Sequence, residues 1–281
     1  MSCLNGTVGV CYGIKSNILR SPKEVVDLYK SKNITKMTLW SKPSYSRDVQ
    51  QLASNNITAL YWINDNVTNY WPSVKLWHPV SPDGSNAQFV LPAMQYIYNA
   101  IMASGLQDQI KVSTDISTKP LGTSYPPSEG ALRDDVPSFI DPNVLFLEKK
   151  GSPLLARIGT TNISYSLFTS QSVVVQDGNL EYQNLFDSMV DTLYSALEMV
   201  VEIVVSEIGW PSTRRIVATT ENARTYISNL IQHVKDGTPK RPGKAIETYV
   251  FSMFDENTKS NIDFRSPTCT CTLHGILSPL M

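Results

Sequence analysis

Charged side chains are scarce in this chain of 281 residues. Lys, Arg, Asp and Glu together make up 17% of it, whereas an average soluble domain has about 25%. The 24 basic and 25 acidic residues leave a formal net charge of −1. So balanced a charge gives no long-range field that would attract nucleic acid or an anionic membrane surface. We therefore expect no nucleic-acid partner and no membrane partner.

Long apolar runs are also missing, since no segment approaches the roughly 18 residues needed to cross a membrane. Hydrophobic residues nevertheless account for 42% of the chain, which excludes a disordered protein. The length is sufficient for one large domain with a substantial core. Uncharged Ser, Thr, Asn and Gln take the place of the missing charges, so the sequence predicts an ordered, neutral, hydroxyl- and amide-rich protein.

Cysteine and histidine are rare, with four and three residues respectively. Four cysteines are too few for a disulfide scaffold in a chain of this length. The spacing Cys269-x-Cys271-x-x-His274 provides two thiols and an imidazole but no fourth ligand for zinc. We therefore expect no bound metal and no cofactor.

Sequons for N-glycosylation occur five times, at Asn5, Asn33, Asn56, Asn66 and Asn162. Together with the low charge, they favour an extracellular, cell-wall or vacuolar glycoprotein. The opening residues Met-Ser-Cys-Leu-Asn-Gly lack the basic start and apolar core of a secretory signal. We therefore expect no signal peptide within the chain as given; either a signal was removed or the protein stays inside the cell.

Segments with strand and helix patterns alternate along the chain. Ser21-Pro22-Lys23-Glu24 forms a capping box with proline at the first helical position, which predicts a helix to about Lys32. Further helices are predicted at residues 88–104, 136–150, 180–197 and 219–235, and strands at residues 8–12, 34–40, 110–113, 154–158, 201–205 and 245–254. Repeated βα units without a glycine-rich phosphate loop predict a parallel sheet closed into a (β/α)₈ barrel. An open doubly wound sheet is the alternative.

Two predicted strands end on carboxylates. Residues 201–206 are followed by Glu207 and, three positions later, by Trp210. Residues 249–254 lead into Asp255 and Glu256, with Asn257 and Lys259 close behind. A carboxylate after an apolar strand is costly to desolvate, which favours a functional role over an ordinary charged loop. Two carboxylates with aromatic platforms and uncharged polar walls are what a carbohydrate-cleaving site needs.

The chain resembles the plant endo-1,3-β-glucanases of glycoside hydrolase family 17, the pathogenesis-related class. Well over half of it matches the family, and the last segments are highly specific. The matching segments are VGVCYG (8–13), VVDLYKSKNITKM (25–37), FVLPAMQYIYNA (89–100), IKVST (110–114), LGTSYPPSEGA (121–131), VVVQDG (173–178), YQNLFDSMVD (182–191), VEIVVSEIGWPS (201–212), ATTENARTY (218–226) and GTPKRPGKAIETYVFSMFDEN (237–257).

This resemblance implies a single (β/α)₈ hydrolase domain over residues 1–265, followed by a divergent tail at 266–281. It implies retaining cleavage of internal β-1,3 linkages in a glucan by a defence protein, which we expect to be monomeric. Glu207 falls on the family's catalytic nucleophile, while Glu256 and Lys259 fall on supporting residues. The residues expected to bind substrate are Tyr12, Trp40, Trp210 and Asn257.

The departures from the family matter as much. The family's general acid is the Glu of a Val-Gly-Asn-Glu motif at a strand end, and this chain runs from Trp77 directly to Val80 without it. Asp83 is the nearest substitute acid. A further strand is compressed into residues 41–47, and Gly-Thr-Thr replaces a Tyr-rich strand end at 159–161. Because a closed barrel needs every strand, the barrel is expected to be incomplete or distorted, or else residues 57–63 must supply a strand.

Three hypotheses remain open. The first is a β-1,3-glucan hydrolase whose activity is impaired by the loss of the general acid. The second is a non-catalytic glucan-binding, lectin-like or allergen-like protein. The third is an aberrant product whose barrel does not close, which cooperative thermal unfolding would contradict.

Overall fold

The computed structural model describes residues 7–13, 20–40, 45–68, 86–159, 163–198, 201–210 and 217–254. The predicted tail at 266–281 and the C-terminal part of the predicted domain lie outside these ranges. The boundary proposed at residue 265 therefore stays a prediction.

The longer helices are α1 (Pro22–Ser31), α2 (Tyr45–Leu52), α3 (Asn56–Asn66), α4 (Ala87–Ala103), α5 (Pro137–Lys150), α7 (Leu185–Ala196) and α8 (Thr220–His233), with the short α6 (Ile163–Ser166) and the 3₁₀ turn η2 (Pro127–Glu129). The central strands are β1 (Val8–Gly13), β2 (Met37–Trp40), β3 (Asp115–Ile116), β6 (Leu154–Arg157), β9 (Ile203–Ile208) and β12 (Thr248–Phe251). The remaining strands of the described residues form three small antiparallel pairs: β4 (Leu121–Thr123) with β5 (Ala131–Leu132), β7 (Val175–Asp177) with β8 (Leu180–Tyr182), and β10 (Gly237–Thr238) with β11 (Arg241–Pro242).

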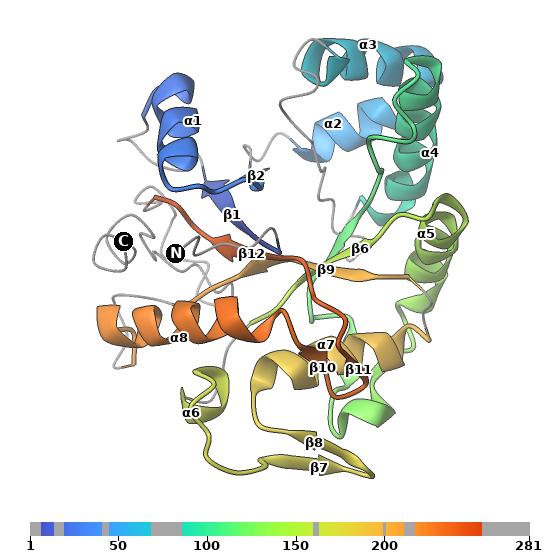
Figure 1. Ribbon diagram of the computed structural model, residues 1–281. Coiled ribbons are helices and arrows are strands. Elements are labelled where there is room, and N and C mark those ends of the chain that lie inside the picture. Colours follow the sequence, from blue (N-terminus) through green and yellow to red (C-terminus); the bar gives the residue numbers. More distant parts are fainter. Residues whose placement is uncertain are drawn as a thin grey trace.

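The six central strands form one sheet in the order β2-β1-β12-β9-β6-β3. Every neighbouring pair in it is parallel. The longer helices lie around the outside of these strands, as Figure 1 shows. Such an arrangement of parallel strands inside a ring of helices agrees with the βα alternation predicted from the sequence.

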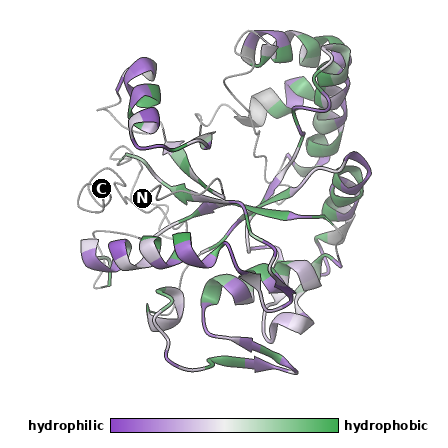
Figure 2. Ribbon diagram, viewed as in Figure 1, coloured by the Kyte–Doolittle hydropathy of each residue, from purple (hydrophilic) through white to green (hydrophobic). Residues whose placement is uncertain are grey.

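Two apolar layers hold the sheet in place. On one face, five buried residues from four strands form a compact interior cluster of their own: Cys11, Leu155, Val204, Tyr249 and Phe251. The other face packs against the helices in a much larger core, to which the alternate residues of the same strands contribute. Figure 2 shows the apolar colouring concentrated on the strands and on the sides of the helices nearest to them. Alternation of side chains along each strand therefore separates an inner face from a helix-covered face.

The predicted helix boundaries are largely confirmed. Ser21 accepts a hydrogen bond from the Glu24 amide while the Glu24 carboxylate accepts one from the Ser21 amide, so the capping box is present. Helix α4 matches the segment predicted at 88–104, and α5 and α8 match those predicted at 136–150 and 219–235.

Four local predictions were wrong. Residues 57–63 supply no strand; they lie in α3, which Asn55 caps by accepting from the Thr58 amide and which buries Ala59 and Ile63 one turn apart. Residues 180–182 form strand β8, and the helix predicted from 180 begins only at Leu185, after the Asn184 cap. In both places the helix begins directly after a capping side chain, Asn55 for α3 and Asn184 for α7. The cap therefore sets the start of the helix, and the apolar spacing does not.

The strand predicted at 201–205 is also displaced, since β9 runs from Ile203 to Ile208. Backbone pairing with its two neighbours carries the strand three residues beyond the predicted end. Residues 110–113, predicted as a strand, precede β3, whose two residues are Asp115 and Ile116.

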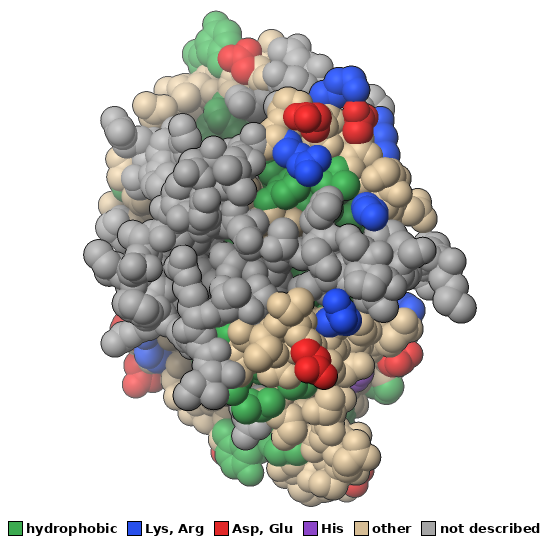
Figure 3. All heavy atoms as spheres, turned by 90° about the vertical axis from the view of Figure 1, so that its left-hand side faces the viewer, with side chains coloured by type: hydrophobic (Ala, Val, Ile, Leu, Met, Phe, Trp, Pro, Cys, Tyr) green, Lys and Arg blue, Asp and Glu red, His purple; other side chains and the backbone are tan. Residues whose placement is uncertain are grey.

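Charge on the surface is mixed. On the face shown in Figure 3, the described Lys and Arg side chains lie singly among Asp and Glu side chains. Paired charges include Lys23 with Asp27 on α1 and Arg133 with Asp135 before α5. Such exposed pairs contribute little to stability.

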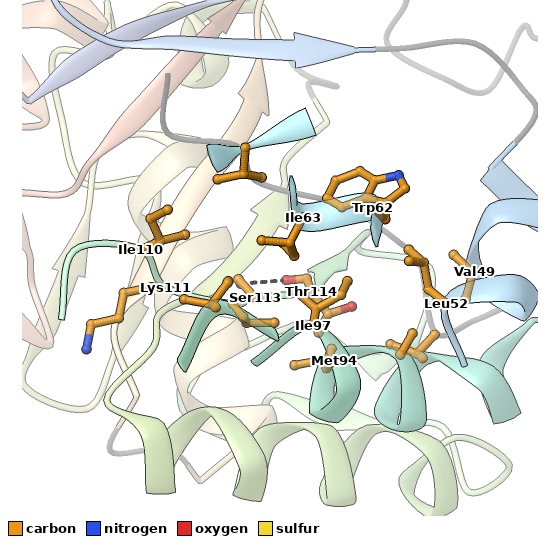
Figure 4. A pocket seen from close by; sticks show the side chains of 15 residues that line it. Val49, Leu52, Trp62, Ile63, Met94, Ile97, Ile110, Lys111, Ser113 and Thr114 are labelled. Carbon is orange, nitrogen blue, oxygen red and sulfur yellow. Dashed lines mark hydrogen bonds between the residues drawn. The ribbon is translucent and has the colours of Figure 1, made fainter. Parts of the chain in front are cut away.

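An apolar cavity lies beside the edge of the sheet. Within the described residues the sheet is not closed: β2 and β3 are its two edges, and α2, α3 and α4 pack against one another in the part of the chain between them. These helices and residues 110–114 enclose a cavity of about 40 Å³. Its labelled lining is mostly aliphatic in Figure 4, where the Lys111 ammonium group points away from the other side chains.

A buried carboxylate ties the hairpins to α7. Asp191 accepts hydrogen bonds from the Thr238 hydroxyl at 2.5 Å, the Lys240 amide at 2.9 Å and the Tyr182 hydroxyl at 3.0 Å. One turn earlier, Asp187 pairs with His233 of α8 at 2.7 Å. Burial raises the pKa of Asp191, and its three hydrogen bonds act in the opposite direction.

Filling the cavity is expected to stabilise the protein. Ala93 and Ala100 are both buried on α4, and only Ala93 lines the cavity. Ala93→Leu places three further carbon atoms toward that space, and cavity filling commonly adds about 0.5–2 kcal/mol. Ala100→Leu is the matched control, where overpacking costs about 1–3 kcal/mol. Thermal unfolding checks both variants, and equal destabilisation would contradict an open cavity beside Ala93.

Stability is expected to depend on pH through Asp191. Its folded-state pKa is raised, so its contribution is fully present below the ordinary aspartate pKa of about 3.9 and is lost as the pH rises through the folded value. Asp191→Asn cannot titrate at this position. The free energy of unfolding of the native protein minus that of Asp191→Asn should therefore fall as the pH rises from 4 to 8. Urea denaturation at several pH values measures this difference; the constant cost of the altered hydrogen bonds does not affect its slope, and a flat profile contradicts the prediction.

Candidate active site

Glu207 occupies the central position of the candidate site. It lies in β9, where its residue is 6% exposed, and its carbonyl accepts a hydrogen bond from the Ile158 amide at 3.1 Å. It pairs with Arg157 across the β6–β9 ladder, just beyond a shift in register. Since β9 is longer than the sequence pattern predicted, Glu207 lies within the strand rather than after it, and its backbone is held on both sides by parallel neighbours.

Tyr12 lies at the same end of the sheet, near the end of β1. Its ring meets that of Phe254 edge-on, with 5.8 Å between centroids and 79° between planes. The Arg20 guanidinium lies 5.9 Å from the Phe254 ring centroid. Burial raises the pKa of the Tyr12 hydroxyl, so the phenol stays protonated and able to donate a hydrogen bond. Partly buried aromatic rings beside a carboxylate suit the binding of a sugar ring.

Trp210 follows β9 and is only 2% exposed. Its indole N–H donates to the Val217 carbonyl at 3.0 Å, and its ring lies 5.7 Å from that of Tyr226. These contacts are those of a packing residue between β9 and α8. The depth of the ring does not support the prediction that it forms an open sugar platform.

Asp115 and Arg157 belong to the same end of the sheet, although the sequence analysis did not single them out. The Asp115 residue is 1% exposed, its carboxylate lies 2.5 Å from the Arg157 Nε, and it accepts from the Ser206 hydroxyl at 2.7 Å. The signal was available: Asp115 follows the apolar segment 110–113, and Arg157 lies inside a predicted strand. A charge placed in an apolar strand is the pattern that identified Glu207.

The other predicted site residues are not described. Glu256, Asn257 and Lys259, together with the substitute acid Asp83, lie outside the described residues. Trp40 ends β2, where its backbone pairs with Gly13, and its side chain is not described. Their expected roles stay predictions.

Neither a metal site nor a membrane span is found in the described part of the chain. No group of three or more His, Cys, Asp or Glu residues there could hold a metal ion. Its helices are too short or too polar to cross a membrane. Cys269, Cys271 and His274, weighed as metal ligands from the sequence, lie outside the described ranges.

The arrangement supports one kind of chemistry. A buried carboxylate near the carboxyl end of a parallel strand, with Ser206 next to it in the chain and Arg157 opposite it in the neighbouring strand, can attack or stabilise a positive centre. The cavity beside α4 is lined mostly by apolar side chains, with Lys111, Ser113 and Thr114 as its polar lining residues, so the carboxylate end of the sheet is the better candidate.

Comparison with known proteins agrees with a carbohydrate-cleaving site. The model of glycosyl hydrolases family 17 matches residues 43–279. A glucan endo-1,3-beta-glucosidase of Vitis vinifera is 48% identical over 296 aligned residues, covering 92% of this chain and 86% of that protein. A basic isoform of the same enzyme from Phaseolus vulgaris is 43% identical, covering 90% of this chain and 84% of its own length.

Solved structures give the same result. A structure from work on two plant beta-glucan endohydrolases with distinct substrate specificities superposes with a TM-score of 0.83 at 36% identity, covering 90% of this chain and 92% of that chain. A beta-1,3-glucanase and allergen of Cryptomeria japonica pollen gives 0.82 at 37%, with the same coverage. The fold class is the (β/α)₈ barrel, of which the described residues form an unclosed sheet of six parallel strands. The chain is a glycoside hydrolase that belongs to glycosyl hydrolase family 17.

Proposed function

We propose that this protein binds β-1,3-glucan and cleaves its internal linkages with retention of configuration, using Glu207 as the nucleophile. The observation that carries the proposal is the position of Glu207, buried near the carboxyl end of a strand at the centre of the parallel sheet. Relatives that are 42–48% identical are named glucan endo-1,3-beta-glucosidases. The scarcity of charge fits an uncharged polymer as the substrate.

In the first step, a Glu207 carboxylate oxygen forms a bond to the anomeric carbon while the bond from that carbon to the leaving oxygen breaks. A strand buried on both sides fixes the approach of the carboxylate. Tyr12, kept protonated by burial, is placed to donate a hydrogen bond at the same end of the sheet. In the second step, water replaces Glu207 at the anomeric carbon, and the product keeps its starting configuration.

The leaving oxygen needs a proton when the substrate is an ordinary glucan. The Val-Gly-Asn-Glu motif that carries the family's general acid is absent from this sequence. Proton donation is worth about 10²–10⁴ in rate. We therefore propose that the protein cleaves glucan slowly, with Asp83 as an inefficient substitute donor.

We further propose a defence role outside the cytosol, in the vacuole, cell wall or extracellular space. A relative from Nicotiana plumbaginifolia is named a basic vacuolar isoform. Among the sequons, Asn33 is exposed in the turn after α1 and is open to glycosylation.

Replacing the nucleophile is expected to abolish hydrolysis. Glu207→Gln keeps the size of the side chain but removes the attacking oxygen's charge, so reducing-sugar release from laminarin should fall by at least about 10³-fold. Mass spectrometry of products formed in ¹⁸O-labelled water identifies the cleaved bond. Equal release by the native protein and by Glu207→Gln would overturn the proposed hydrolase.

The missing proton donor leads to a second prediction, which does not depend on the Glu207→Gln experiment. An aryl β-laminaribioside with a dinitrophenolate leaving group needs no protonation as it departs. The native protein should therefore cleave it with a kcat/KM at least about 10²-fold above that for laminarin oligosaccharides of similar length. Similar values for the two substrates would show that an effective general acid is present.

A non-catalytic glucan-binding protein is the second candidate. The absent motif and the unclosed sheet of the described residues favour it. Laminarin binding in isothermal titration calorimetry, with no release from either substrate, would identify this function.

A further inference from the structure

A cluster of polar side chains supports the strand end that carries Glu207. Asp115 of β3, Arg157 of β6 and Ser206 of β9 come from three successive strands of the sheet. Their contacts bring together three side chains that lie 42 to 91 positions apart in the chain. The parallel order of the strands makes these contacts possible. None of the three was assigned a role by the family resemblance.

Both oxygens of the Asp115 carboxylate are engaged. The Ser206 hydroxyl donates to Oδ1 at 2.7 Å and also lies 3.3 Å from the Ala156 carbonyl. The Arg157 Nε lies 2.5 Å from Oδ2. The Asp115 side chain is 1% exposed and that of Arg157 is 29% exposed, so the carboxylate is enclosed while the guanidinium reaches toward solvent.

The cluster lies just above the apolar interior layer. Leu155 pairs with Asp115 across the β3–β6 ladder, and Leu155 belongs to the interior cluster together with Val204. Arg157 and Ser206 each stand two residues further along their strands. Because side chains alternate, Arg157 shares the inner face with Leu155. The ladder pairs Leu155 with Val204 and Arg157 with Glu207, so β9 has one residue more than β6 in this interval and Glu207 also lies on the inner face. The polar cluster is therefore the next layer toward the end of the sheet where Glu207 lies.

Stability alone does not explain a buried ion pair here. Apolar residues of similar volume at such positions are often neutral or stabilising, because they avoid the cost of desolvating two charges. An ion pair with a hydrogen bond instead fixes the relative positions of the groups that it joins. The positions it fixes here are those of β3, β6 and β9.

Two of the joined residues are direct neighbours of Glu207. Ser206 precedes it in the chain, and Arg157 is its partner across the β6–β9 ladder. The ladder shifts register between Ala156 and Arg157, so regular backbone pairing is interrupted beside Glu207. Side-chain contacts through Asp115 bridge this interruption.

We propose that Asp115 is a positioning residue, which holds Ser206 and Arg157 so that the Glu207 carboxylate keeps a fixed place at the end of β9. Asp115 is enclosed and ion-paired, and it acts on the reaction only through its neighbours. This inference rests on the proposed role of Glu207 as the nucleophile.

The experiment measures only the first step, in which Glu207 attacks the anomeric carbon. A dinitrophenyl 2-deoxy-2-fluoro-β-laminaribioside transfers its sugar to the nucleophile: a bond forms between the Glu207 oxygen and the anomeric carbon, and dinitrophenolate leaves with the electron pair of the broken bond. No proton donor is required, and the fluorine slows release of the sugar. Intact mass and peptide mapping give the rate and the site of labelling.

Ser206→Ala is the test variant and Ser113→Ala its matched control. Ser113 is also buried, and its hydroxyl lies 2.7 Å from the Pro153 carbonyl and 3.1 Å from the Thr114 carbonyl. Both variants lose one buried hydroxyl of the same hydrogen-bond length. We expect the saturating rate of labelling to fall at least tenfold in Ser206→Ala with an unchanged half-saturating concentration, and to stay within twofold of the native rate in Ser113→Ala.

A paired replacement separates positioning from stability. Asp115→Leu with Arg157→Met removes both charges together, so we expect near-native thermal unfolding with labelling slowed at least tenfold. Native labelling rates in both Ser206→Ala and this double variant would overturn the inference while leaving the nucleophile assignment intact. If the native protein is not labelled on Glu207, the proposed function fails and the inference fails with it.

Discussion

The parallel pairing of β9 with β6 and β12 is the constraint on which the site depends. All six residues of β9 are buried, so its backbone groups find no water and must pair with strands on both sides. That pairing sets the register of Ser206 and Glu207 against Arg157. A slip of one residue would turn Glu207 to the face covered by helices. The chemistry proposed for this protein therefore depends first on backbone hydrogen bonds and only then on the identity of its side chains.

Polarity increases along the inner face of the sheet toward that end. An apolar layer that includes Leu155 and Val204 comes first, and the ion-paired layer of Asp115 and Arg157 follows it. Glu207 lies at the end of this series. This order of layers has a physical reason. A carboxylate that attacks a sugar needs solvent access on one side and rigid support on the other. The apolar layer supplies the rigidity, while the charged layer makes the transition from the dry interior to the binding surface.

The sheet is unclosed where the chain departs from its family. Its edges in the described residues are β2 and β3, and the interval between them along the chain contains the place where the Val-Gly-Asn-Glu motif is absent. Helices α2, α3 and α4 occupy that interval and pack around an apolar cavity. Helices that normally cover strands keep their apolar faces where the described residues place no strand beneath them, which accounts for an aliphatic lining. The missing motif and the open edges of the described sheet thus fall in the same interval of the chain.

The sequence by itself determined the alternation of strands and helices, most helix boundaries, and the importance of Glu207, because apolar periodicity, caps and a carboxylate beside an apolar strand are local signals. It did not determine that β9 continues to Ile208, or that Trp210 is enclosed by Val217 and Tyr226. Tertiary structure decided these, and it alone joined Asp115 to Ser206. Contacts between strands distant in sequence depend on the order and register of the sheet, and a linear pattern of residues carries no direct record of either.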